Sequence, residues 1–172
     1  KKNLPFYKFG DAIYLAKIET KYWIEYICKR FENTGKHISP ELAEEICRLV
    51  DNHSSYVQQL SWLLWIRTIN TATTEQLSYA LEDLLDQNNI LFQSETENLS
   101  AYQMNFLKAI VDGIHTKFSS KEVISKYNLG TSANIVRLKN ALLQKELIET
   151  NGKEIVLADP VFGVWFKKEM LY

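Results

Sequence analysis

Apolar residues recur at helical spacing through the first half of the chain, in four groups separated by polar turns. Apolar positions three and four residues apart form one face of a helix. The pattern predicts helices over residues 20–33, 40–50 and 56–69, and a fourth from residue 74 onward. The buried faces are expected to hold Trp23, Ile24, Ile27, Cys28, Phe31, Leu42, Ala43, Ile46, Leu49, Val50, Val57, Leu60, Leu63, Leu64, Leu77, Ala80, Leu81, Leu84 and Leu85.

Polar residues indicate where these helices begin. Thr20 is predicted to cap the first helix, and Ser39, which precedes a proline, the second. Thr73 and Gln76 have the spacing of a capping box, in which each side chain accepts a backbone N–H from the other residue. A helical bundle is the expected result.

Residues 11–18, before the first helix, are rich in β-branched and aromatic side chains. This composition predicts a strand. No partner strand is evident nearby, although a lone strand leaves backbone groups unpaired. The chain also lacks an initiator Met, so we expect it to be cut from a longer protein.

The apolar pattern changes in the second half of the chain, where three shorter helices are expected first. Ser100 with Gln103 and Ser119 with Glu122 predict capping boxes, and Thr131 is predicted to cap the third helix. Short strands are then expected on either side of an Asn-Gly pair at residues 151–152, the strongest short hairpin signal. Three helices followed by a β-hairpin predict a winged helix-turn-helix.

A last helix is predicted after Asp159 and the proline that follows it. Its apolar face carries Phe162 and Trp165, which we expect to close onto the first helix of the winged helix, near Phe106 and Ile110.

A polar stretch at residues 93–98 suggests where the two halves divide. We therefore expect a mainly α fold. Residues 20–97 would form the helical bundle and residues 98–172 the winged-helix domain with its small β-hairpin. Residues 1–19 would be the remnant of a preceding domain.

Composition and charge narrow the class of protein. Hydrophobic residues make up 46% and charged residues 24% of the chain, as in globular proteins. No apolar run approaches the ~18 residues of a membrane span, and no signal peptide is evident. Cys28 and Cys47 are expected to be free thiols in a reducing cytoplasm.

The net charge of −1 is unevenly distributed, at −4 over residues 1–98 and +3 over residues 99–172. The second half is thus only mildly basic, whereas a dedicated nucleic-acid binder has a strong basic bias.

No catalytic or metal-binding motif is evident in the sequence. The six glycines are dispersed, and no phosphate-binding loop of the form G-x-x-x-x-G-K-[ST] occurs. The cysteines and the three histidines fit no zinc motif. The acidic pairs Glu44-Glu45 and Glu82-Asp83 fall on polar helix faces and are expected to be solvated. We therefore predict that this chain is not an enzyme by itself, and that it holds no cofactor or metal.

The third helix of the winged helix is the candidate for DNA recognition. Exposed residues near the start of such a helix point toward the major groove, where Arg reads guanine and Asn reads adenine. The candidate DNA contacts are Ser132, Asn134, Arg137 and Lys139, with Lys153 in the wing. The acidic Glu149 and Glu154 beside Lys153 argue against DNA, and packing against protein is the favoured role.

Tyr56, Trp62 and Trp65 form an aromatic group on the third predicted helix. A helix that is apolar most of the way round lies centrally or in an interface. We expect these residues to be core, with a partner-binding surface as the alternative.

Four stretches together resemble the C-terminal half of the archaeal-type P-loop ATPases, which are relatives of the AAA+ and STAND ATPases and are also widespread in Bacteroidetes. Residues 6–15 look like the last strand of the ATPase core. Residues 52–60 look like the turn and helix of the helical lid. Residues 120–137 look like the winged-helix core, and residues 159–166 like its closing helix.

The resemblance implies that the Walker motifs, and with them the ATP and Mg²⁺ site, lie in an ATPase core upstream of this chain. It also implies that His53 and Tyr56 lie on the adenine side of the lid. The sequence departs from the family at Ser54 and Ser55, where the lid turn of such ATPases often has a proline. This departure weakens the assignment of His53 and Tyr56.

The chain is thus expected to be the non-catalytic lid and winged-helix regulatory part of a P-loop ATPase, with the missing ATPase core as its partner. Two alternatives stay open: a winged-helix DNA-binding transcription regulator, and a protein-interaction adaptor that uses the aromatic helix.

Overall fold

The computed structural model describes residues 17–171. Within this range the fold is mainly α, as predicted, with one two-stranded antiparallel sheet. The elements in chain order are α1 (Thr20–Glu32), α2 (Pro40–Leu49), α3 (Ser54–Arg67), α4 (Thr74–Glu97), α5 (Ala101–Val111), α6 (Lys121–Tyr127), α7 (Ser132–Gln144), β1 (Ile148–Asn151), β2 (Glu154–Leu157) and α8 (Pro160–Leu171). The strand expected over residues 11–18 lies outside the described residues, apart from Lys17 and Ile18, as does most of the remnant expected over residues 1–19.

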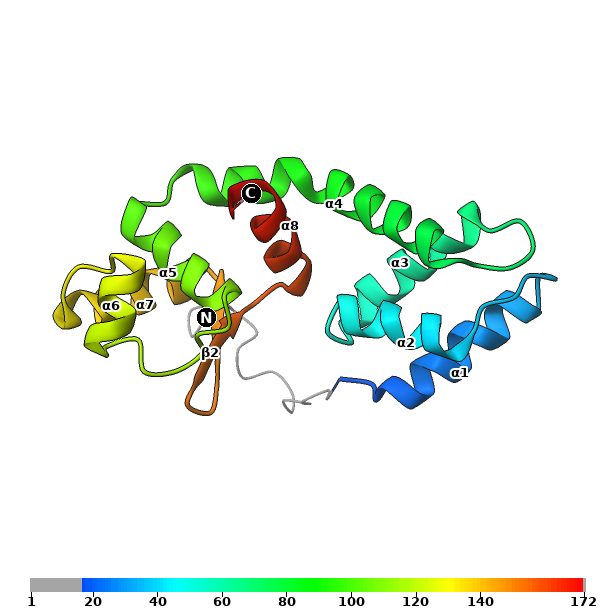
Figure 1. Cartoon of the computed structure of the whole chain (residues 1–172), viewed down its shortest axis with the longest axis horizontal. Helices are drawn as coiled ribbons and strands as arrows, with labels where there is room; N and C mark the ends of the chain where they lie inside the picture. Colours follow the sequence, from blue (N-terminus) through cyan, green and yellow to red (C-terminus); the bar gives the residue numbers. More distant parts are fainter. Residues whose placement is uncertain (1–16, 172) are drawn as a thin grey trace, which may run out of the picture.

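Helices α1, α2 and α3 and the first half of α4 form one lobe (Figure 1). The predicted capping residues account for the starts of α2 and α4. The Ser39 hydroxyl accepts the Leu42 N–H at 3.2 Å, and Thr73 and Gln76 form the full capping box. Thr20 is an exception, because it is the first helical residue and Glu19 occupies the cap position. The Thr20 hydroxyl instead accepts a hydrogen bond at 3.0 Å from the Asn52 side chain, before α3.

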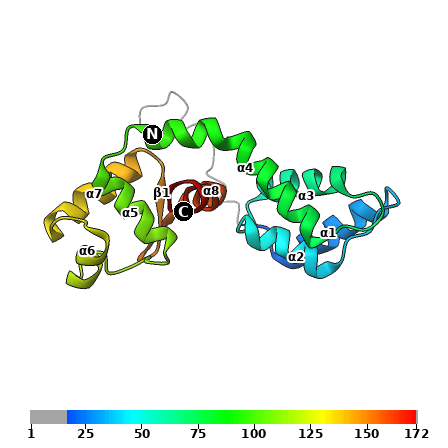
Figure 2. The ribbon, with the colours of Figure 1, turned by 45° about the horizontal axis from the view of Figure 1, so that its top comes forward.

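Helix α4 is the long helix that connects the two halves of the molecule (Figures 1 and 2). Its first turns bury Leu77, Ala80 and Leu84 in the α1–α3 lobe, and its last turns bury Phe92 and Thr96. The helix continues without interruption through residues 93–97, where the polar pattern suggested a division. The domain boundary between residues 97 and 98 therefore stays a prediction, and α4 extends to the residue before it.

Helices α5, α6 and α7 with the hairpin form the second lobe. The capping box of Ser100 and Gln103 is present as predicted. The box expected for Ser119 and Glu122 is wrong by one residue, because Ser120 is the cap and its hydroxyl accepts the Val123 N–H.

The hairpin is present, but its turn differs from the predicted one. Asn151 pairs with Glu154, so the two turn residues are Gly152 and Lys153. Gly152 has a φ of +61°, whereas Asn151 and Lys153 are not among the described residues with positive φ. A turn with positive φ at its first central residue alone has the geometry of type II′, which favours glycine there.

Helix α8 lies between the lobes and packs against both α4 and α5 (Figures 1 and 2). The Asp159 carboxylate caps it, since Oδ1 accepts the N–H groups of Val161 and Phe162 at 2.8 and 3.0 Å. Phe162 and Trp165 are buried as expected. Their ring contacts are with Phe92 of α4 at 5.5 and 5.6 Å, whereas Phe106, expected beside them, stacks on Phe118.

Candidate functional site

The turn before α3 carries the two residues expected near adenine. His53 occupies the cap position of α3 and is exposed, and Tyr56 lies in the first turn of the helix, half-buried. Their ring centroids are 4.7 Å apart, with the planes inclined by 41°. The chain reaches this position through two consecutive left-handed residues, Asp51 (φ +48°) and Asn52 (φ +53°).

Tyr56 also makes a contact that sequence reasoning missed. Its hydroxyl donates a hydrogen bond to Asp159 Oδ2 at 2.6 Å, across 103 positions of sequence. Because Oδ1 of the same carboxylate caps α8, one side chain ties the start of α3 to the start of α8. Burial, and next the hydrogen bond to Asp159, raise the pKa of Tyr56, so the phenol stays protonated as the donor.

Helix α4 adds a carboxyl group to this contact. The pKa of Glu95 is raised, first by its partial burial and second by the negative charge of Asp159. Tyr56 of α3, Glu95 of α4 and Asp159, which precedes α8, are therefore close enough to influence one another electrostatically. We call Tyr56, Glu95 and Asp159 the junction cluster.

Two further contacts hold α8 on α4. The Trp165 indole N–H donates to the Asn89 side-chain oxygen at 2.8 Å, and Lys168 forms an ion pair with Glu82. The Trp165 bond is partly buried and satisfies the only polar group of a buried indole. Glu82 was expected to be simply solvated, and the structure gives it this partner instead.

The structure brings only some of the candidate DNA contacts to the surface. Ser132, Arg137 and Lys153 are exposed, and Lys139 is half-buried. Asn134 is half-buried, and its amide donates to the Leu129 carbonyl at 3.0 Å, which holds the turn before α7. Of the four candidate contacts on α7, only Ser132 and Arg137 are thus exposed.

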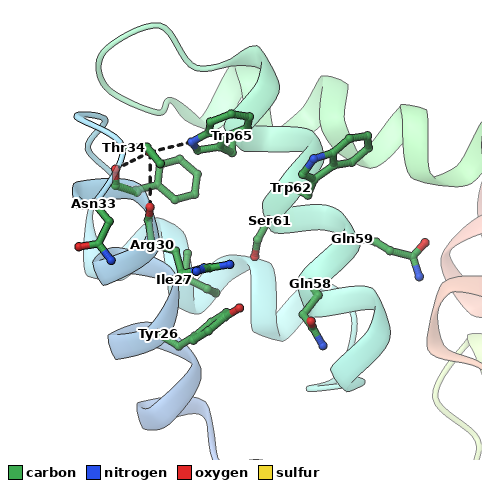
Figure 3. A pocket seen from close by; sticks show the side chains of 11 residues that line it. Tyr26, Ile27, Arg30, Asn33, Thr34, Gln58, Gln59, Ser61, Trp62 and Trp65 are labelled. Atoms are coloured by element: carbon green, nitrogen blue, oxygen red, sulfur yellow. Dashed lines mark hydrogen bonds between the residues drawn. The ribbon is translucent and has the colours of Figure 1, made fainter.

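The aromatic group expected in the core does not stay together. Trp62 is 57% exposed and Trp65 is half-buried, whereas Tyr56 joins the junction cluster. The core assignment is therefore wrong for Trp62. Instead, Trp62 and Trp65 line a groove of about 570 Å³ between α1 and α3 (Figure 3).

Residues 17–171 contain no group of three or more His, Cys, Asp or Glu side chains placed to hold a metal ion. No helix in the same range combines the length and apolar character needed to cross a membrane.

Comparisons with known proteins agree with this architecture. Residues 90–168 match the sequence model of a family described as "Probable winged helix domain". No curated protein sequence matches the chain. Among solved structures, the Walker-type ATPase PABY2304 of Pyrococcus abyssi superposes with a TM-score of 0.65 at 18% sequence identity.

The superposition covers 88% of this chain but 42% of the P. abyssi chain, so the present chain spans less than half of the length of that protein. At this identity the likeness is evidence of a common fold. The second half of this chain is therefore similar to the winged-helix family, and most of the chain shares its fold with a part of a Walker-type ATPase.

Proposed function

We propose that this chain is the non-catalytic helical lid and winged-helix regulatory part of a cytoplasmic P-loop ATPase. The fold shared with part of a Walker-type ATPase, over 88% of this chain, is the observation that carries the proposal. Residues 20–97 would be the lid and residues 98–172 the regulatory winged helix. The ATP and Mg²⁺ site would lie in the ATPase core outside this chain.

The junction cluster supports a regulatory role. A nucleotide can change the position of the winged helix only if its two states contact the lid differently. His53 and Tyr56 would lie on the adenine side of the lid, and Tyr56 donates to Asp159 at the start of α8. A movement of α3 that follows nucleotide binding would therefore pull on α8, which is clamped to the long helix α4.

The residues at the lid turn offer only part of a nucleotide site. The exposed His53 ring, beside Tyr56, could present an aromatic face to a base. The Tyr56 hydroxyl is already used by Asp159. Phosphate groups need backbone N–H donors and a cation of the kind that a phosphate-binding loop supplies, and the sequence has no such motif.

The test is to produce the isolated chain and the complete reading frame that contains it, and to measure ATP binding and hydrolysis by both. The complete protein should carry a Walker A motif and hydrolyse ATP, with loss of turnover when the Walker lysine is replaced by alanine. The isolated chain should release no phosphate above background. A complete reading frame without a Walker A motif, or micromolar ATP binding by the isolated chain, contradicts the proposal.

DNA binding by α7 is the second candidate function. The exposed Arg137 favours it, because no described carboxylate pairs with this guanidinium. The engaged amide of Asn134 and the acidic wing, with Glu149 and Glu154 both exposed, disfavour it.

A further inference from the structure

The groove between α1 and α3 is a surface that the proposed function does not use. Figure 3 shows Tyr26 and Arg30 pointing from α1 toward α3, where Gln58 and Trp62 line the same groove. Trp65 lies at the end of the groove, next to the turn after α1. We call this surface the aromatic groove.

Trp65 is held rigidly in its place in the aromatic groove. Its indole N–H donates to the Thr34 hydroxyl at 2.9 Å. The Lys36 ammonium lies 3.9 Å from the ring centroid and donates to the Trp65 carbonyl oxygen at 2.6 Å. An aromatic wall that is already ordered loses little conformational entropy when a ligand binds.

Exposed apolar side chains continue beyond the groove on both helices. Tyr22 and Tyr26 are four residues apart on α1, and Trp62 and Ile66 are four residues apart on α3, so each pair lies on one helix face. All four are exposed, and Trp62 is an aromatic of the kind that is enriched at binding hot spots. Two apolar stripes with a hollow between them have the shape of a site for an amphipathic helix.

The charge of the groove indicates what else the ligand carries. Arg30 is the only charged residue among the described residues that line it. Its guanidinium lies over the Tyr26 ring at 5.7 Å, and no described carboxylate forms an ion pair with it. An arginine on an aromatic ring keeps its donors available, and a carboxylate matches them with two parallel hydrogen bonds.

We propose that the aromatic groove binds an amphipathic helical peptide of a partner protein. The peptide presents large apolar side chains about one turn apart, which pack on Tyr26, Trp62 and Trp65, and an Asp or Glu that pairs with Arg30. No residue of the junction cluster lines this groove.

The test is selection of 12-residue peptides displayed on phage against the purified chain, with counter-selection against Trp62→Ala. Enriched peptides, synthesised with a fluorescent label, would then be titrated by fluorescence anisotropy. We expect paired apolar residues with a neighbouring Asp or Glu. Trp62→Ala should weaken binding at least tenfold, whereas Tyr102→Ala, an exposed aromatic outside the groove, should leave it unchanged.

Charge reversal at Arg30 distinguishes a specific ion pair with the peptide from non-specific apolar binding. Arg30→Glu should weaken the selected acidic peptides at least tenfold and strengthen versions in which lysine replaces the acidic residue. Circular dichroism checks that each variant is folded. Three outcomes overturn the proposal: no enrichment on the wild-type chain, enriched peptides without acidic residues, or sedimentation showing that the wild type forms a dimer which Trp62→Ala dissociates. The last result would mean that a second copy of the chain covers the groove.

Discussion

The Tyr56 hydroxyl connects the starts of two helices that are far apart in sequence, so its removal should lower the free energy of unfolding. Tyr56→Phe keeps the ring and deletes only the hydrogen bond to Asp159. Hydrogen bonds to charged groups contribute about 1.5–3 kcal/mol. We expect urea denaturation to show a loss of unfolding free energy near the lower end of this range, because the site is half-buried.

Tyr79 supplies the matched control for this substitution. Its hydroxyl contacts Glu75 at 3.4 Å on the exposed surface of α4. Tyr79→Phe should therefore change the unfolding free energy by less than about 0.5 kcal/mol. Equal effects of the two substitutions would show that the Tyr56–Asp159 contact adds nothing to stability.

Glu95 gives the junction cluster a pH dependence. Its pKa is raised by burial and then by Asp159, so the folded state binds the Glu95 proton more tightly than the unfolded state does. Ionisation of Glu95 therefore opposes folding. Glu95→Gln should raise the melting temperature slightly at pH 7, corresponding to less than about 1 kcal/mol, because solvent reaches the partly buried side chain and screens its charge.

This gain should shrink as the pH falls through the raised pKa of Glu95. It should be absent below the ordinary glutamate value of about 4.3, where both states are protonated. Melting curves between pH 4 and pH 8 test the prediction. A destabilised Glu95→Gln protein at pH 7 would show that the carboxylate makes a favourable contact instead.

Helix α8 is the element on which the two lobes depend most. Trp165 is 1% exposed, contacts Phe92 and Phe162, and donates to Asn89. Trp165→Ala should cost about 3–5 kcal/mol, as for other large core aromatics. Trp62→Ala removes the same side chain from an exposed site, and thermal denaturation should show little change. A Trp165→Ala protein as stable as Trp62→Ala would make α8 a peripheral helix.

Helix α7 should bind DNA weakly if it binds at all. Non-specific affinity comes from phosphate neutralisation, and residues 99–172 have a net charge of only +3. We expect detectable binding of a mixed-sequence duplex only at low salt, with a shallow salt dependence and a loss in Arg137→Ala. Lys167→Ala, which removes an exposed cation on α8, should have a smaller effect. Nanomolar binding that survives Arg137→Ala would contradict this expectation.

The elements could be predicted from sequence because their signals are local. The caps at Ser39, Thr73 and Ser100 depend on hydrogen bonds to residues three positions ahead. Local signals fail where two registers are equally plausible. Ser119 and Ser120 are both good caps, and in the structure Ser120 is the cap. The hairpin likewise places its glycine at the first turn position, because strand pairing fixes the register.

The candidate sites were less predictable, because they depend on contacts between distant segments. Nothing near Tyr56 in sequence indicates that Asp159 is its partner. The exposure of Trp62 depends on how closely α1 approaches α3. The spacing of apolar residues along one helix does not predict the distance between two helices. Helix α4 passes through a polar stretch in which Thr96 is buried, and just before it Phe92 packs on Phe162 and Trp165 of α8, a contact set by tertiary packing.

In the whole molecule, α4, α8 and the junction cluster connect the two lobes. The continuous helix α4, and α8 bound to it, would carry a movement of the lid to the winged helix. Such coupling is expected to alter the activity of an attached ATPase core when the Tyr56–Asp159 contact is removed, even though neither residue belongs to a phosphate-binding motif.

The most direct measurement is the steady-state rate of ATP hydrolysis by the complete protein that contains this chain, as wild type, Tyr56→Phe and Tyr79→Phe. We expect the wild type to hydrolyse ATP, Tyr56→Phe to change the rate by about fivefold or more, a common size for coupling between sites, and Tyr79→Phe to leave the rate unchanged. A complete protein without ATP hydrolysis, or a rate that Tyr56→Phe leaves at the wild-type value, would contradict this prediction.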